Sequence, residues 1–195
     1  MRIGVLGLQG AVREHVRSLD RLGIESRTVK RTDQLDGLDG LILPGGESTA
    51  ISLLADGPFL ARLREMAHAE FPMFGTCAGM ILLAARVEGR ESPYIGAIDI
   101  DVERNASGRQ VHSFETELEI EGIGPYGAVF IRAPYIVRQG PGVTVLARYD
   151  DTATMAREKN ILVCSFHPEL TDDARIHRVF ADMIDTGNQR KEDVG

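Results

Sequence analysis

Cys77 is the side chain best placed to act as a nucleophile, because it lies within the segment Gly75-Thr-Cys-Ala-Gly79. The apolar run 72–75 precedes it and the apolar run 80–85 follows it, which predicts a strand-to-helix turn around the thiol. Small neighbours relieve crowding in such a turn, and a helix N-terminus favours the thiolate. The N–H of Ala78 can then face a developing oxyanion. Cys77 could instead be a small buried hydrophobe, but the flanking glycines favour a nucleophile.

A nucleophilic thiol needs a base and a group that orients the base, and His167 and Glu169 supply both. The proline between them favours an extended backbone, in which residues two apart point the same way. We therefore expect Glu169 to hold one imidazole nitrogen of His167 while the other nitrogen faces the thiol. A loop histidine beside a solvated carboxylate is the alternative. The pair follows the apolar run 161–166, however, and the carboxyl ends of parallel strands meet at one sheet edge.

A third segment, Pro44-Gly-Gly-Glu-Ser-Thr49, follows the short apolar run 40–43. Paired glycines let a backbone come close to a substrate and direct N–H groups at it. The segment could equally be a turn with a helix cap at Ser48 or Thr49. It lacks the Gly-Lys-Ser/Thr of a phosphate-binding loop, and the early glycines do not form a dinucleotide-binding pattern. We therefore expect no cofactor.

Metal binding is disfavoured by the spacing of the possible ligands. Cys164 and His167 are three residues apart, but a structural zinc site needs a second ligand pair at suitable spacing. Cys164 lies in an apolar run and is interpreted as inert packing. The remaining histidines do not supply a second pair and are interpreted as surface or core residues: His15, His68, His112 and His177.

The elements that must position these residues alternate between strand and helix in the first half of the chain. This alternation predicts a parallel sheet with helices on both faces. The predicted strands are residues 2–8, 24–29, 40–43 and 72–75, and the predicted helices are residues 12–22, 59–69 and 80–85.

The second half changes to short strands separated by glycine and proline. It ends with an amphipathic helix through Ile176, Phe180 and Ile184, whose spacing follows the helical repeat. The predicted strands are residues 98–102, 115–120, 127–131, 143–149, 153–156 and 161–166.

Composition limits the classes of function. The 195 residues include 22 Lys and Arg against 29 Asp and Glu, and the net charge of −7 argues against a general binder of nucleic acid or anionic membranes. Two cysteines do not make a disulfide framework, and no apolar run approaches the roughly 20 residues that span a bilayer. We therefore expect a cytoplasmic protein with one domain over residues 1–185 and a polar, disordered tail over residues 186–195.

The Gly-Gly loop after a strand, the Gly-Thr-Cys-Ala-Gly turn and the late His-Pro-Glu resemble the class I (triad) glutamine amidotransferases. Within that superfamily the chain resembles the family of glutaminase subunits of pyridoxal 5′-phosphate synthase. The segments that carry this resemblance are GLQG (7–10), LPGGEST (43–49), FGTCAG (74–79), ERN (103–105), GRQ (108–110), FIRAP (130–134) and CSFHPEL (164–170). One departure is Ser107, where the family usually has an aromatic residue.

The resemblance implies a single-domain, three-layer α/β/α sheet of flavodoxin-like type, with a mostly parallel centre and antiparallel strands added in the second half. It implies hydrolysis of L-glutamine to L-glutamate and ammonia through a thioester. Cys77 would be the nucleophile, His167 the acid and base, and Glu169 its orienting group. The implied oxyanion hole is formed by Gly46 and Ala78. The implied glutamine site comprises Gly46, Glu47, Ser48, Arg104, Ile131 and Arg132.

The resemblance also implies a partner, a barrel-shaped synthase subunit in a ring-shaped hetero-oligomeric complex. That partner would combine the ammonia with a pentose phosphate and a triose phosphate to make pyridoxal 5′-phosphate. Without the resemblance, Arg104 and Arg132 could equally form surface ion pairs. Two other functions remain open: another cysteine-triad enzyme of the same fold, and a binding module without catalysis. The GLQG and GRQ segments argue against the first, and the intact Cys, His and Glu argue against the second.

Overall fold

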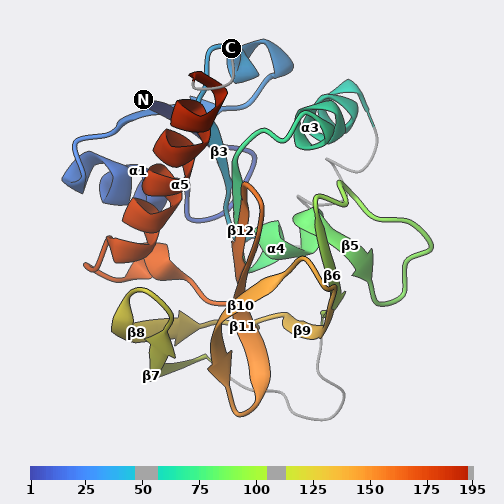
Figure 1. Cartoon of the computed structure of the whole chain (residues 1–195), viewed down its shortest axis with the longest axis vertical. Helices are drawn as coiled ribbons and strands as arrows, with labels where there is room; N and C mark the ends of the chain where they lie inside the picture. The colour runs from blue at the N-terminus through green and yellow to red at the C-terminus, as the bar shows by residue number, and fades with distance from the viewer. Residues whose placement is uncertain (47–56, 105–112, 193–195) are drawn as a thin grey trace.

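The computed structural model describes residues 1–46, 57–104 and 113–192, and within them ten strands form one mixed sheet (Figure 1). A separate antiparallel hairpin consists of β7 (Phe114–Ile120) and β8 (Gly124–Phe130). In spatial order the strands of the large sheet are β2 (Glu25–Val29), β1 (Arg2–Leu6), β3 (Gly40–Leu43), β4 (Met73–Thr76), β12 (Ile161–Cys164), β11 (Thr152–Glu158), β9 (Tyr135–Gln139), β6 (Ile98–Glu103) and β5 (Ala84–Val87), with β10 (Thr144–Tyr149) paired to β11 beside this path.

The parallel half of the sheet runs from β2 to β12. Its central strands β3, β4 and β12 are buried at every residue, as expected for strands covered on both faces. Leu43 pairs with Gly75, and Thr76 pairs with Cys164. This register brings the carboxyl ends of the three strands to the same edge of the sheet.

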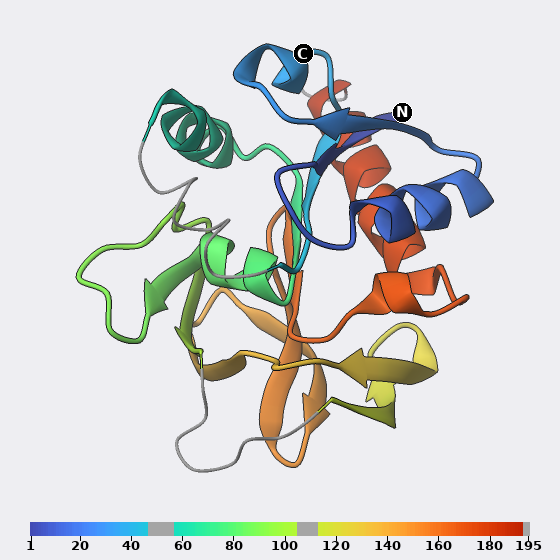
Figure 2. The ribbon, with the colours of Figure 1, turned by 180° about the vertical axis from the view of Figure 1, so that it is seen from behind.

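Helices cover both faces of the parallel half and complete three layers (Figures 1 and 2). The helices are α1 (Val12–Arg21), α3 (Pro58–His68), α4 (Ala78–Leu83) and α5 (Arg175–Glu192). Leu19 of α1 and Phe180 of α5 pack with Phe74 in one core, whereas Leu63 of α3 and Met80 of α4 belong to the other. Successive strand residues therefore alternate between two cores. The predicted three-layer α/β/α fold with a mostly parallel centre is confirmed.

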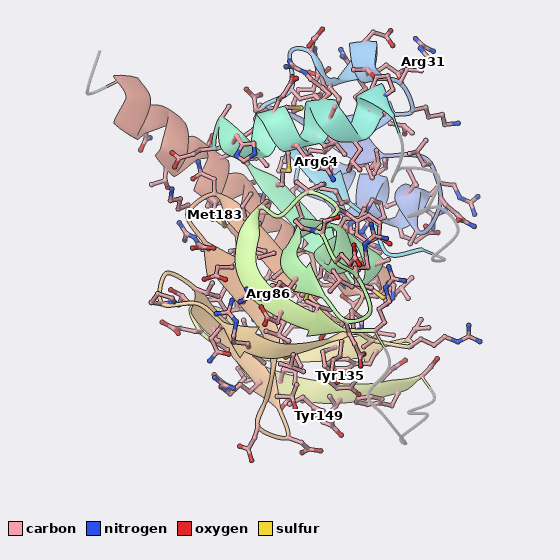
Figure 3. The ribbon with its side chains drawn as sticks, turned by 90° about the vertical axis from the view of Figure 1, so that its right-hand side faces the viewer. Arg31, Arg64, Arg86, Tyr135, Tyr149 and Met183 are labelled. Carbon is pink, nitrogen blue, oxygen red and sulfur yellow. The ribbon has the colours of Figure 1, made fainter. Side chains whose placement is uncertain are left out.

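The second half of the chain extends the sheet with antiparallel strands. β11 runs antiparallel to β12, β9 and β10, and β9 runs antiparallel to β6. β5 closes this end and pairs in parallel with β6, where Arg86 Nε donates to Asp101 Oδ1 at 3.0 Å (Figure 3). The parallel centre thus continues into an antiparallel extension, as expected.

Three elements differ from the prediction. The predicted helix over residues 80–85 ends at Leu83, because Ala84 turns to an extended conformation and begins β5. β9 was not predicted. α5 continues through Glu192, so the expectation of a disordered tail is wrong for residues 186–192. Among the described residues, no helix is both long and apolar enough to cross a membrane.

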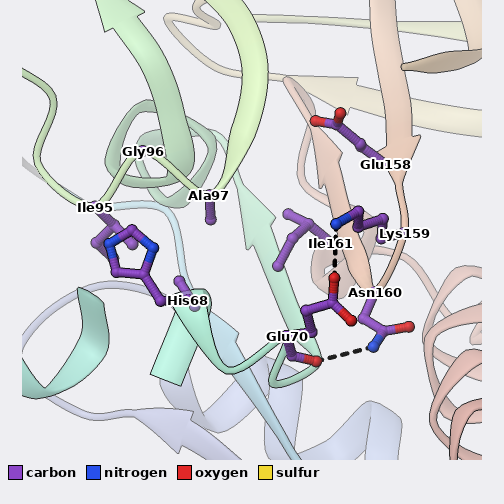
Figure 4. Close-up of a pocket in the computed structure, with 10 residues that line it drawn as sticks. His68, Glu70, Ile95, Gly96, Ala97, Glu158, Lys159, Asn160 and Ile161 are labelled. Carbon is purple, nitrogen blue, oxygen red and sulfur yellow. Dashed lines mark hydrogen bonds and ion pairs between the residues drawn. The ribbon is translucent and has the colours of Figure 1, made fainter. Parts of the chain in front are cut away.

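A cavity of about 230 Å³ opens at the amino ends of β4 and β12 (Figure 4). Lys159 Nζ donates to Glu70 Oε1 at 2.6 Å, and Asn160 Nδ2 donates to the Glu70 carbonyl oxygen at 2.8 Å. Open α/β sheets bind their ligands at the carboxyl ends of the strands. This cavity lies instead at the amino ends of the strands, on the sheet edge opposite to Cys77.

Candidate active site

Three segments meet at the carboxyl edge of β3, β4 and β12. Cys77 follows β4 directly, and its N–H donates to the carbonyl oxygen of Cys164 at 2.8 Å, which connects the turn to the end of β12. A Cβ added to Gly45 would lie 2.5 Å from Cε1 of His167 and 3.1 Å from Cβ of Cys77. The Gly-Gly loop after β3 therefore contacts both side chains, and the structure brings the three predicted segments together.

Cys77 occupies a strained turn between β4 and α4. Its φ of 49° and ψ of −107° are rare for a residue with a side chain, and such strain costs about 1–3 kcal/mol where it persists. The turn is possible because α4 begins close to β3. A Cβ added at Gly79 would lie only 1.9 Å from the carbonyl oxygen of Leu43. The predicted strand-to-helix turn is therefore present, with a nearly buried thiol at its tip.

The imidazole of His167 is held by a buried carboxylate. Nδ1 of His167 lies 2.7 Å from Oε1 of Glu169, which is a short hydrogen bond of the charge-assisted kind. The Glu169 side chain is fully buried, and that of His167 is 10% exposed. The nitrogen that remains, Nε2, is not engaged by Glu169, and the neighbouring Cys77 side chain helps to raise the pKa of His167. The structure thus places the three predicted catalytic residues in one connected group.

The route by which Glu169 reaches His167 differs from the prediction. The sequence predicts an extended segment, but Glu169 lies in a short 3₁₀ turn, η2 (Pro168–Leu170), after His167 with φ −110° and ψ 84°. Proline suits the first position of such a turn, because its fixed φ is already helical and its missing N–H is not needed there. The turn, rather than two-residue alternation, folds the carboxylate back onto the imidazole.

The electrostatics of the group favour charge separation. Burial alone would lower the pKa of His167, but its hydrogen bonds to Cys77 and Glu169 outweigh burial and raise the pKa. Burial opposes ionisation of Glu169, but the neighbouring His15 and His167 outweigh it and lower the pKa of the carboxyl group. The raised pKa of His167 and the lowered pKa of Glu169 together favour a charged imidazole held by an ionised carboxylate.

The predicted oxyanion donors lie next to the thiol in the chain and in the Gly-Gly loop. Ala78 is the first residue of α4, so its N–H belongs to the helix N-terminus. Gly46 follows Gly45, whose N–H donates to Thr76 Oγ1 at 3.1 Å and fixes the loop against β4. Gly10 packs beneath this loop with φ +98°, and an added Cβ would lie 1.7 Å from the Gly45 carbonyl oxygen. The GLQG segment thus supports the loop that carries Gly46.

Two of the predicted glutamine-binding residues are close to the thiol: Ile131 contacts it, and Arg132 is the next residue in the chain. Cys77 Sγ is 3.9 Å from the carbonyl oxygen of Ile131, and Arg132 follows with φ 45° and an exposed side chain. Arg104 contacts Tyr94 instead, with its Nη2 donating to the phenol oxygen. Its Nε is buried without a hydrogen-bond partner among the described residues. The predicted residues Glu47 and Ser48 lie outside the described ranges, as does Ser107.

Two histidines contribute to the site although the sequence singles out neither. His15 on α1 and His177 on α5 are fully buried, which agrees with the core alternative of the prediction. His15 Nε2 lies 3.4 Å from Oε2 of Glu169, and His15 Nδ1 lies 2.9 Å from Nε2 of His177. No group of three metal-ligating side chains that could hold an ion exists in residues 1–46, 57–104 and 113–192. His15 thus contacts the carboxylate of Glu169 directly, and His177 contacts His15 behind it.

The free energy of unfolding should decrease below pH 6.5, because His177 is buried in its neutral form. Burial and the neighbouring His15 lower its pKa from 6.5 to about 3 in the folded protein. Between these values the unfolded chain binds a proton that the folded chain does not, so the free energy of unfolding decreases as the pH falls below 6.5. One such group contributes a loss of roughly 2 kcal/mol by pH 5. The His177→Leu variant should lack this loss in urea unfolding curves at pH 7.5 and pH 5.

His68 provides the matched control, because it is an exposed histidine at the end of α3. The His68→Gln variant should retain the acid sensitivity of the wild type, since an exposed imidazole keeps its hydration on folding. Equal acid sensitivity of wild type and His177→Leu would contradict the prediction.

Known proteins resemble this chain over nearly its whole length. A protein from Geobacillus kaustophilus named "Pyridoxal 5'-phosphate synthase subunit PdxT" is 56% identical over 186 residues, covering 94% of this chain and 95% of the relative. A protein of the same name from Carboxydothermus hydrogenoformans is 55% identical over 190 residues, covering 96% of this chain and 100% of the relative. A solved structure titled "Crystal structure of glutamine amidotransferase" is 48% identical, with a TM-score of 0.88 over 93% of this chain and 98% of that chain.

The fold and the site together are those of an α/β protein that carries a cysteine thiol at a strand-to-helix turn, beside a histidine held by a carboxylate. The model of the SNO glutamine amidotransferase family matches residues 5–186, nearly the whole chain. The chain therefore belongs to the SNO glutamine amidotransferase family.

Proposed function

We propose that this chain is the glutaminase subunit of a pyridoxal 5′-phosphate synthase and that Cys77, His167 and Glu169 carry the hydrolysis of L-glutamine. The observation that carries the proposal is the 2.7 Å contact between His167 Nδ1 and Glu169 Oε1, made where the Gly45 backbone contacts both this imidazole and Cys77. Two named relatives that are more than half identical over nearly the whole chain support the assignment to this synthase.

The first half of the reaction forms a thioester. The thiolate of Cys77 attacks the side-chain amide carbon of glutamine, and the carbonyl electron pair moves to oxygen. The N–H groups of Gly46 and Ala78 stabilise this oxyanion, and removal of one such donor typically costs about 10²–10³ in rate. The imidazolium of His167 then protonates the amide nitrogen, the carbon–nitrogen bond breaks, and ammonia leaves.

The second half returns the thiol. Neutral His167 takes a proton from water, and the resulting hydroxide attacks the thioester carbon. The carbon–sulfur bond breaks, glutamate leaves, and the sulfur returns to the thiolate beside a protonated imidazole. Glu169 accepts the hydrogen bond from Nδ1 throughout, so it keeps Nε2 directed at the reacting atoms and stabilises the imidazolium.

Arginine side chains suit the α-carboxylate of glutamine, because a guanidinium binds a carboxylate with two parallel hydrogen bonds. Arg132 follows Ile131, whose carbonyl oxygen contacts the Cys77 thiol, and its side chain is exposed. We assign Arg132 and Arg104 to the carboxylate, and Gly46, Glu47, Ser48 and Ile131 to the rest of the glutamine.

The proposed partner is a barrel-shaped synthase subunit in a ring-shaped complex, which would receive the ammonia. The names of the relatives support a synthase partner. We place the reaction in the cytoplasm, where Cys77 and Cys164, both unpaired, remain reduced.

The function is tested by measuring glutamate release from L-glutamine with and without the synthase subunit of the same organism. We expect low activity of the isolated chain and higher activity in the complex, with L-asparagine as an inactive control substrate. High activity that the synthase subunit leaves unchanged would favour a glutaminase of another pathway. Absence of hydrolysis in both samples would exclude the proposed function.

A further inference from the structure

A chain of buried contacts continues behind the carboxylate of Glu169. His15 Nε2 lies 3.4 Å from Glu169 Oε2 and 3.3 Å from Thr76 Oγ1, and His15 Nδ1 lies 2.9 Å from His177 Nε2. His15, His177 and the Glu169 side chain are all fully buried. Figures 1 and 2 show the two helices that carry these histidines, α1 and α5, side by side on one face of the sheet.

The two oxygens of Glu169 have different surroundings. Oε1 accepts the hydrogen bond from His167, whereas Oε2 has no well-aligned hydrogen-bond donor among the described residues. A buried carboxylate oxygen that has lost its water needs compensation from nearby positive charge or dipoles. Nε2 of His15 is the nitrogen that the structure places against it.

The groups at the two ends of this chain of contacts, His177 Nδ1 and Glu169 Oε2, indicate which nitrogen donates in each histidine contact. If His15 Nδ1 carried the proton, His177 Nε2 would accept it and the buried His177 Nδ1 would be an N–H without an acceptor in the described part of the chain. The lone pair of His15 Nε2 would then face a carboxylate oxygen, which is repulsive. In the opposite direction His177 Nε2–H donates to His15 Nδ1, and His15 Nε2–H donates to Thr76 Oγ1 with Glu169 Oε2 3.4 Å from the same nitrogen.

We propose that His15 is a positioning residue for the triad and that His177 fixes its tautomer, so that two neutral imidazoles support the second oxygen of Glu169. This inference rests on the proposed glutaminase function and extends it from three residues to five. Neutral imidazoles are expected here, because burial lowers the pKa of both histidines.

The role of this pair is to keep Glu169 ionised and in one orientation. Without the N–H dipole of His15 near Oε2, the carboxylate would gain by protonation or by turning toward another partner, and either change weakens its hydrogen bond to His167. A weaker hydrogen bond stabilises the imidazolium less and leaves its Nε2 less well aligned with Cys77.

The charged or titratable groups that face His15 are Glu14 on its own helix, His177 on α5, and His167 and Glu169 at η2.

The test compares His15→Leu with His15→Gln in the complex with the synthase subunit. Leucine fills the space without a donor, whereas the glutamine amide reaches the position of Nε2 and restores one. We expect His15→Leu to lower kcat by about 10- to 100-fold, as is typical when a group that orients a catalytic residue is lost. The KM for glutamine should change less than about threefold, since His15 does not touch substrate. His15→Gln should recover most of kcat.

A second readout is independent of glutamine turnover. Iodoacetamide alkylates the thiolate, so the pH dependence of Cys77 alkylation reports the thiolate–imidazolium pair. We expect His15→Leu to shift this profile to higher pH and His15→Gln to restore it. Both variants are measured in a Cys164→Ala background, so that one thiol is observed.

Leu19→Val is the control for general loosening of α1, because Leu19 is fully buried on the same helix and packs in the same core. It should leave kcat and the alkylation profile unchanged. If His15→Leu does not fold, His177→Leu tests the same chain of contacts, with a kcat loss of severalfold that His177→Gln restores.

Wild-type kcat and alkylation profile in a folded His15→Leu or His177→Leu protein would overturn the inference. So would a glutamine variant that loses as much kcat as the leucine variant. If wild-type protein in the complex fails to hydrolyse glutamine, the proposed function fails, and the alkylation profiles still decide the role of His15.

Discussion

Replacing Cys77 by alanine should abolish the release of ammonia from L-glutamine, because the thioester then has no sulfur atom on which to form. The expected loss in kcat is on the order of 10⁴-fold or more, as for other enzymes that lose their nucleophile. Alanine keeps the Cβ and the backbone N–H that donates to the carbonyl oxygen of Cys164, so the fold should be retained. Coupled assays of ammonia and glutamate, together with thermal unfolding curves, measure both effects.

The Cys164→Ala variant is the matched control, since it removes the other thiol of the chain. Cys164 is fully buried, and burial raises the pKa of its thiol, so it stays protonated and unreactive. This variant should keep most of the activity at a modest loss of stability. Activity retained in Cys77→Ala, or lost in Cys164→Ala at unchanged stability, would contradict the assignment of the nucleophile.

Replacing Gly10 by alanine should inactivate the enzyme through the loop that it supports. The new Cβ would overlap the carbonyl oxygen of Gly45, and φ at this position is +98°. Backbone cannot yield as a flexible side chain does, so Gly45 and Gly46 must shift, and the N–H of Gly46 leaves the position proposed for it as an oxyanion donor. We expect kcat/KM to fall by about 10²–10³, the usual cost of losing one oxyanion donor.

The Gly37→Ala variant is the control that distinguishes displacement of the Gly45–Gly46 loop from backbone strain at a glycine with positive φ. Its φ of +73° is also unfavourable for alanine, but an added Cβ would meet nothing within 4 Å. Gly37→Ala should therefore lose roughly 1 kcal/mol of stability and keep kcat/KM. Similar kcat/KM values for the Gly10 and Gly37 variants would refute the role of the GLQG segment.

The parts of the site that depend on short segments were predictable from the sequence. The strand-to-helix turn at Cys77 follows from local features, because glycines and two apolar runs surround this residue. The pairing of His167 with Glu169 was also expected, although for the wrong reason. Proline favours both an extended residue before it and the first position of a 3₁₀ turn, and only the packed structure decides between them.

The parts that depend on distant contacts were not predictable. His15 lies on the apolar stripe of α1 with Val12, Val16 and Leu19, so its helical spacing could have shown that it is buried. Its contacts with Glu169 and His177 join three segments far apart in the chain, and no local pattern encodes them. The pairing of Arg104 with Tyr94 is of the same kind.

The position of β12 also determines when the enzyme becomes active during synthesis. β12 comes last in sequence among the strands of residues 1–46, 57–104 and 113–192, yet it inserts between β4 and β11 in the middle of the sheet, and the turn with His167 follows it. Pairings between distant segments form late, because their loop-closure entropy must be overcome first. A ribosome-bound chain that has exposed Cys77 but not β12 lacks the base, so its thiol cannot turn over glutamine. Catalytic competence therefore requires that β12 and the turn after it have also left the ribosome.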